Sequence, residues 1–200
     1  KEDGSYEKIE TPPPGMIDPR SFVRFSPRQF TLLPQGRQLV RIQLQKPADL
    51  PDGEYRLHLN FKSLPHDDGL PRSNPDGPGV HMELRVTIGI SMPVVIRQGT
   101  YQAHAEITEA RFGLPPGTNV RKNQPPQLIV KINRTGIHGT YGRLRVFWQD
   151  KGEETLIGTL NNFSVYADNP VRIGYIALNQ SGINSGQLRV VYEGDGPQRG

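Results

Sequence analysis

An all-β fold is predicted by three features of this 200-residue sequence. Apolar and polar residues alternate with a period of two along several segments, as expected for strands with one buried and one wet face. Glycine (22 residues) and proline (19 residues) interrupt any long helix, because proline lacks an amide donor and glycine adds backbone entropy. Hydrophobic residues make up only 34% of the chain, which favours thin cores between packed sheets. The sequence therefore predicts antiparallel β-sandwiches.

The first half of the chain predicts about four strands from Phe22 onward. The clearest alternation covers residues 40–44, 55–62 and 83–92. The first twenty residues, which include Pro12-Pro13-Pro14-Gly15, predict a loop. Turn clusters separate the strands, namely Pro34-Gln35-Gly36, Leu50-Pro51-Asp52-Gly53 and the long polar run 66–79.

The second half predicts a further series of short strands. Alternating or apolar segments cover residues 128–132, 144–148, 154–160, 163–166, 171–178 and 188–192, with a turn at Asp150-Lys151-Gly152. Residues 101–112 contain neither glycine nor proline and could form a helix, but they lack a helical apolar stripe, so a strand is favoured. A short break near Gly99 predicts two domains, 1–98 and 99–200.

Several classes of function are excluded or disfavoured by composition and motifs. Cysteine is absent, which removes disulfides, zinc–thiolate sites and cysteine nucleophiles. We find no phosphate-binding P-loop and no nucleophile elbow, so we expect no enzyme and no cofactor. No apolar run is long enough to span a membrane. The net charge of +4 predicts no nucleic-acid partner. We expect no metal site, because Asp67-Asp68-Gly69 lacks a calcium-loop spacing and the histidines are scattered, at His58, His66, His81, His104 and His138.

A set of short motifs is spread over most of the chain. The first half carries Phe25-Ser26-Pro27-Arg28, Gln38-Leu39-Val40-Arg41-Ile42, Leu50-Pro51-Asp52-Gly53-Glu54-Tyr55-Arg56, Leu64-Pro65 and the run Ile90-Ser91-Met92-Pro93-Val94-Val95-Ile96-Arg97. The second half carries Arg134-Thr135-Gly136, Tyr141-Gly142 and Val165-Tyr166. The motifs of the first half resemble those of the PapD-like periplasmic pilus-assembly chaperones, and those of the second half resemble a divergent bacterial branch of that family.

The resemblance implies two immunoglobulin-like β-sandwich domains in a boomerang arrangement. An immunoglobulin-like sandwich needs about seven strands, and the first half offers fewer. We therefore expect the opening strands of the first domain, a signal peptide and a cleft arginine to lie upstream of Lys1.

The resemblance also implies a periplasmic chaperone that binds and stabilises exported pilus or fimbrial subunits by donor-strand complementation, without ATP. The implied donor strand presents the apolar row Leu84, Val86, Ile88, Ile90 and Met92. Implied partners are pilin or fimbrial subunits and an outer-membrane usher. Neither nucleic acid nor direct membrane insertion is expected, and the exposed row would permit self-association. The alternative is that this row faces the core of its own domain.

Other functional positions of the family are matched only in part by this sequence. Glu54 and Arg97 occupy places of a polar bridge between the domains, and Gln180 stands where the family has an acidic third partner. The alternative for Glu54 and Arg97 is two solvated surface charges. Ser91 falls on or near the place of a lysine that helps to bind the subunit's terminal carboxylate, so Ser91 is the candidate anchor here.

Two other functions remain open. The chain could be a two-domain immunoglobulin-like adhesion or structural module that contacts partners through its loops. It could also bind an acidic polymer through Arg143 and Arg145, although such residues more often form a solvated face.

Overall fold

The fold is all-β in the part of the chain that our computed structural model describes, which comprises residues 1–7, 9, 11, 14–64, 87–114, 127–180, 183 and 185–194. One short 3-10 helix, Pro19–Ser21, precedes the strands. The strands are β1 (Val23–Ser26), β2 (Arg41–Leu44), β3 (Gly53–Lys62), β4 (Gly89–Gln98), β5 (Ala103–Gly113), β6 (Gln127–Gly136), β7 (Thr140–Asp150), β8 (Glu153–Val165), β9 (Val171–Ala177) and β10 (Gln187–Gly194). The all-β class predicted from the sequence is confirmed.

The chain forms two compact units. Unit 1 consists of residues 1–18, 46–54 and 97–200, and unit 2 consists of residues 19–45 and 55–96. The first two residues of β3 and the last two of β4 therefore belong to unit 1. The division into domains 1–98 and 99–200 stays a prediction.

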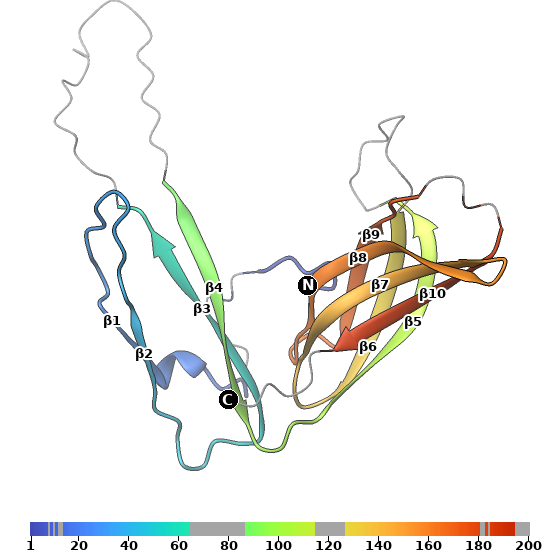
Figure 1. The fold of residues 1–200 in the computed structure, drawn as a ribbon. Coiled ribbons are helices and arrows are strands. Elements are labelled where there is room, and N and C mark those ends of the chain that lie inside the picture. The colour runs from blue at the N-terminus through green and yellow to red at the C-terminus, as the bar shows by residue number, and fades with distance from the viewer. Residues whose placement is uncertain are drawn as a thin grey trace, which may run out of the picture. The chain divides into compact units, whose positions relative to one another are not determined.

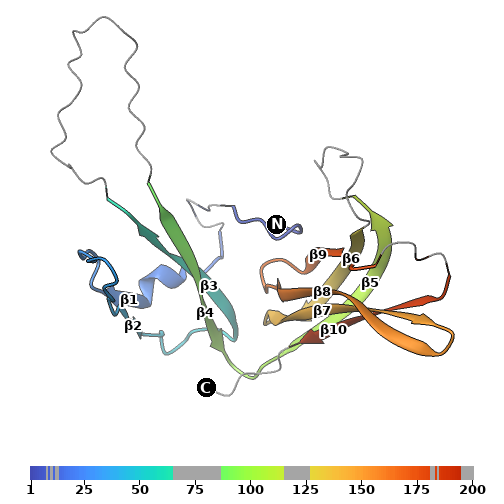
Figure 2. The same ribbon diagram turned by 45° about the horizontal axis from the view of Figure 1, so that its top comes forward.

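Unit 1 is built on two three-stranded antiparallel sheets that pack face to face (Figures 1 and 2). One sheet has the order β5-β6-β9 and the other has the order β10-β7-β8. Alternate residues of β6 and β7 point between the sheets, and Val130, Ile132, Leu144 and Val146 are completely buried. The period-two pattern of the sequence thus becomes the core of a sandwich.

The predicted turn at Asp150-Lys151-Gly152 joins β7 to β8 as a two-residue hairpin loop. Asp150 pairs with Glu153, and the two residues between them have left-handed backbone angles, with φ of 50° at Lys151 and 89° at Gly152. Two consecutive left-handed residues make the turn whose twist matches that of the flanking strands.

One prediction in this region is wrong, because β8 is a single strand where the sequence predicts two, at 154–160 and 163–166. The pairing with β7 shifts register twice along β8, once where Asn161 and Asn162 face Arg143. Asn162 takes a left-handed conformation with φ of 55°. A β-bulge therefore absorbs the polar pair that resembles a loop in the sequence.

The choice of strand over helix for residues 101–112 is confirmed by β5. This strand pairs antiparallel with β6 from Ala103 opposite Gly136 to Gly113 opposite Gln127, with one bulge after Ile107. The predicted strands at 40–44, 55–62, 128–132, 144–148, 171–178 and 188–192 correspond to β2, β3, β6, β7, β9 and β10. The run 66–79 and the first part of the segment 83–92 lie outside the described residues.

The described residues of unit 2 form two two-stranded sheets, β1-β2 and β3-β4, and a small core. Its buried apolar side chains in the described part are Phe22, Leu59 and Ile96. Many of its large apolar side chains are exposed instead, namely Phe30, Leu32, Leu33, Leu39, Ile42, Leu44, Leu64, Ile88, Ile90 and Met92. Relative to the number of apolar side chains that it buries, unit 2 therefore exposes more large apolar side chains than unit 1 does. Such exposed apolar surface is typical of a binding surface.

The described residues include no helix with the length and apolar character needed to cross a membrane.

The sandwich core predicts that two leucines on neighbouring strands differ strongly in how much stability the protein loses when each is replaced by alanine. Leu144 of β7 is completely buried, whereas Leu156 of β8 is 43% exposed. We expect Leu144→Ala to lower the free energy of unfolding by about 2–5 kcal/mol, because it leaves a cavity between the sheets. Leu156→Ala should lower it by less than about 1 kcal/mol. Urea unfolding followed by the fluorescence of Trp148, the one tryptophan, reports on unit 1. Equal losses for the two variants would contradict this core.

Candidate functional site

One edge of strand β4 is open in the part of the chain that the structure describes. β4 pairs with β3 on one side, and none of the other described strands pairs with it. Apolar side chains at the start of β4 are exposed, with Ile90 at 67% and Met92 at 45%, and Ile88, which directly precedes the strand, is 68% exposed. An open edge combined with an exposed apolar row provides both the backbone groups and the side chains that strand addition requires.

The predicted donor row is thus described in part. Leu84 and Val86 lie outside the described residues. Along the same face of β4, the side chains pass from exposed Met92 to half-buried Val94 and to Ile96, which is 5% exposed. The end of β4 is therefore fixed in a core, while its beginning is exposed to solvent.

Ser91, the candidate anchor for a carboxylate, is exposed. Strand alternation places its side chain on the face opposite to Ile90 and Met92. In the described part of the chain its hydroxyl has no hydrogen-bond partner. Ser91 alone therefore offers one weakly held hydroxyl and no charge.

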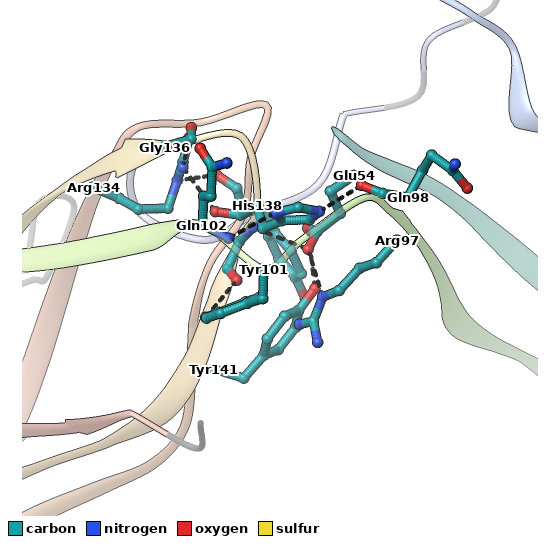
Figure 3. A network of polar contacts seen from close by, with 11 residues as sticks. Glu54, Arg97, Gln98, Tyr101, Gln102, Arg134, Gly136, His138 and Tyr141 are labelled. Carbon is teal, nitrogen blue, oxygen red and sulfur yellow. Dashed lines mark hydrogen bonds and ion pairs between the residues drawn. The ribbon is translucent and has the colours of Figure 1, made fainter. Parts of the chain in front are cut away.

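Glu54 and Arg97 form an ion pair within unit 1, and the carboxylate of Glu54 is buried. Glu54 Oε2 accepts hydrogen bonds from Arg97 Nε at 3.2 Å and from the Gly139 backbone nitrogen at 3.0 Å. Its Oε1 accepts one from the Tyr141 hydroxyl at 3.2 Å. The Glu54 side chain is 2% exposed, and Figure 3 shows it pointing toward Arg97 and Tyr141. These donors keep the charge stable away from water.

The guanidinium of Arg97 lies against two tyrosine rings. Its Cζ atom is 4.9 Å from the centre of the Tyr141 ring and 5.3 Å from that of Tyr101 (Figure 3). Such cation–π contacts hold the side chain in one orientation. Gln180, predicted as a third member of the bridge, is half-buried and forms no hydrogen bond with Glu54 or Arg97 in the described structure.

His138 fastens the segment that leads from β4 into β5. The imidazole is completely buried. Its Nδ1 accepts a hydrogen bond from the backbone nitrogen of Gln102 at 3.0 Å, so Nε2 carries the proton and donates it to the carbonyl of Gln98 at 3.0 Å. The Tyr101 ring stacks on the imidazole with centres 5.6 Å apart. One side chain therefore holds both ends of residues 98–102 (Figure 3).

Arg134 supports the loop that carries His138. It is 6% exposed and donates hydrogen bonds to four backbone carbonyls, those of Gly136, His138, Tyr166 and Ala167. Burial lowers the pKa of this guanidinium, while the negative charges of Glu54 and Asp168 oppose the shift. The side chain thereby holds the loop between β6 and β7 against the segment after β8.

Arg143 and Arg145, the candidate residues for binding an acidic polymer, are both paired inside unit 1. Arg143 Nε lies 2.6 Å and Arg145 Nη1 lies 2.9 Å from the two carboxylate oxygens of Glu193. Both guanidinium groups share the carboxylate of Glu193 on the neighbouring strand. This negative charge weakens the attraction that the two arginines could exert on an acidic polymer.

Comparison of the chain with protein-family models, with curated proteins and with solved structures finds no match.

Sequence reasoning selected Glu54 and Arg97 but missed the residues around them. Tyr141 and Arg134 stand within motifs noted in the second half, Tyr141-Gly142 and Arg134-Thr135-Gly136, so a signal for them was present. His138 has no local signal, because its partners are backbone groups 40 and 36 residues away.

The two hydrogen bonds of the His138 imidazole hold both ends of residues 98–102, an arrangement that we call the His138 clamp. A substitution that keeps an aromatic ring but removes these hydrogen bonds should lower the free energy of unfolding. His138→Phe keeps a ring beside Tyr101 but leaves Gln98 C=O and Gln102 N–H without a partner. We expect the free energy of unfolding to fall by about 2–4 kcal/mol, because each buried unpaired group costs about 1–3 kcal/mol. His104→Phe, on the exposed side of β5, is the control and should change little. Urea unfolding of the two variants measures the difference, and similar losses would contradict the clamp.

The surroundings of Tyr141 predict a loss of stability at alkaline pH. Burial, followed by the charge of Glu54, raises the pKa of the Tyr141 hydroxyl above its usual value near 10. The unfolded chain therefore loses this proton first, so stability is complete below about pH 10 and declines as the pH rises further. Tyr141→Phe should flatten that decline, because it removes the group whose pKa is raised. Urea midpoints from about pH 9 to pH 11 test this, and equal slopes for Tyr141→Phe and the wild type would refute it.

Proposed function

We propose that this chain is a periplasmic chaperone of the PapD-like type, which stabilises exported fimbrial subunits by lending them strand β4. The observation that carries the proposal is the open edge of β4 with Ile88, Ile90 and Met92 exposed along one face. Immunoglobulin-like sandwich folds for both domains, the periplasmic location and an outer-membrane usher as second partner belong to the same proposal and derive from the sequence motifs.

Strand addition matches the needs of a subunit that lacks its own last strand. Such a subunit exposes an unpaired sheet edge and an uncovered apolar groove, and both promote aggregation. β4 supplies backbone donors and acceptors to the edge. Its apolar side chains follow one another about 6–7 Å apart, the spacing of every second residue in a strand.

The gain in free energy is sufficient for a temporary complex. Burying Ile88, Ile90 and Met92 contributes on the order of 4–9 kcal/mol before the cost of association is subtracted. Leu84 and Val86 would extend the row in the sequence. A complex of this strength protects the subunit and still allows a better-fitting strand to replace β4.

The experiment measures capture of a subunit by the chaperone. A fimbrial subunit unfolded in urea is diluted into the wild-type protein, and the complex is isolated by size-exclusion chromatography. We expect a one-to-one complex with the wild type and a loss of at least about tenfold in its yield with the double variant Ile88→Asp, Ile90→Asp, since charged groups cannot enter an apolar groove. Thr87→Asp, one residue away on the opposite face, should retain capture.

Each other outcome counts against donation by β4. Normal capture by the double variant would refute it, because the apolar row would be unnecessary. Capture by none of the proteins would favour the adhesion or structural module. A wild-type dimer that dissociates in the double variant, with no subunit bound, would indicate self-association in place of chaperone activity.

A further inference from the structure

The segment between β1 and β2, residues 27–40, displays large apolar side chains on an ordered turn. We call this segment the β1–β2 loop. Leu33 and Leu39 are each 72% exposed, and Leu32 is 56% exposed. The backbone nitrogen of Gly36 donates a hydrogen bond to the Leu33 carbonyl at 2.8 Å, which closes a turn where the chain reverses between the two strands (Figure 1). The structure therefore holds these leucines in solvent and outside the core of unit 2.

Local sequence favours this turn. Pro34 stands at its second position, where the φ near −65° that a proline ring imposes is the angle required. Gln35 stands at its third position with a left-handed φ of 58°, as a type II turn needs. Because the turn is made by its own residues, it keeps Leu32 and Leu33 exposed without a tertiary contact to support them.

The segment that carries the β1–β2 loop is basic throughout. Residues 19–45 contain five arginines and neither aspartate nor glutamate. Arg28, Arg37 and Arg41 are exposed, and none of them forms an ion pair among the described residues. Arg41 pairs with Ser26 at the base of the loop, Arg28 lies two residues beyond Ser26, and Arg37 directly follows the turn. Positive charge thus extends from the base of the loop to its turn.

The combination of exposed leucines and unpaired arginines selects the class of partner. Nucleic acid or an acidic polymer would neutralise the arginines but offers the leucines no apolar interior to enter. An uncharged apolar groove would accept the leucines and leave the arginines without a counter-charge. The surface of an anionic lipid bilayer satisfies both, since leucines enter the boundary between headgroups and acyl chains while arginines bind the lipid phosphates.

We infer that the β1–β2 loop is a peripheral docking surface for an anionic lipid bilayer. Its leucines lie at the boundary of the acyl chains in the docked state, and its arginines lie at the phosphates. Contact of this kind stops at the interface, so it needs no membrane-spanning segment. The inference uses this loop and the base of β2 alone, and it does not rest on the donation of β4.

The first experiment measures binding to vesicles by sedimentation. One set of vesicles contains phosphatidylcholine alone, and the other contains equal parts of phosphatidylcholine and phosphatidylglycerol. We expect the wild-type protein to bind only the second set, and we expect sodium chloride to weaken this binding because it screens the charges. No binding to either set, or equal binding to both, would overturn the inference.

Arginine variants test the contribution of charge in the same assay. Arg37→Gln should lower the partition coefficient about fivefold, the contribution expected of one basic residue near an anionic surface. Arg37 is preferred to Arg28 because the Arg28 guanidinium also lies 5.5 Å from the ring centre of Phe25. Arg111→Gln, which removes an exposed arginine of β5, is the matched control and should bind as the wild type does. Equal losses for the two variants would refute a role for this loop.

Leucine variants and a single fluorophore test whether the turn enters the interface. The double variant Leu32→Ser, Leu33→Ser should lower the partition coefficient at least about tenfold, whereas Leu156→Ser, at an exposed leucine of unit 1, should not. The chain contains no cysteine, so Leu33→Cys provides one site for an environment-sensitive label. Its emission should shift to the blue with the anionic vesicles, and that of a label at Leu156→Cys should stay constant. Constant emission at position 33 would rule out the docking.

Soluble poly-glutamate distinguishes a bilayer from an acidic polypeptide as the partner. At the same concentration of negative charge, we expect it to leave most of the protein on the anionic vesicles, because it offers the leucines nothing to enter. Displacement of the protein, with equal affinity of poly-glutamate for the wild type and the double leucine variant, would show that the loop binds acidic polypeptides and would overturn the inference. None of these assays contains a fimbrial subunit, so their outcome is separate from that of subunit capture.

Discussion

The buried carboxylate of Glu54 is surrounded by hydrogen-bond donors, and the geometry around it depends on those donors. Arg97, Gly139 and Tyr141 reach it from three separate segments of the chain. Glu54 stands at the start of β3 and Arg97 near the end of β4, and both residues belong to unit 1, so the network lies within that unit. A buried ion pair adds little net stability, because desolvation offsets most of its attraction, but the loss of one partner leaves an unpaired charge in the interior.

The two units differ in how they use apolar residues. Unit 1 buries its alternating residues between two three-stranded sheets, with Val130, Ile132 and Leu144 fully inside. Unit 2 has two separate pairs of strands and leaves residues such as Leu39, Ile42 and Ile90 exposed. Apolar surface next to open strand edges is a hazard for a protein that has no partner, and it is an asset for one that completes another fold. The proposed strand donation is the use that accounts for both features of β4.

The sequence alone determined the all-β class, most strands and the hairpin turn at residues 150–152, because these depend on period-two burial and on local backbone preferences. It also singled out Glu54 and Arg97 through their motifs. The tertiary structure decided that β8 continues through Asn161 and Asn162, since a bulge is stabilised by pairing with β7 and has no local code. It alone revealed His138 as a clamp, because the partners of this imidazole are backbone groups. Backbone groups are the same in nearly every residue, so the sequence cannot show which of them will pair with His138.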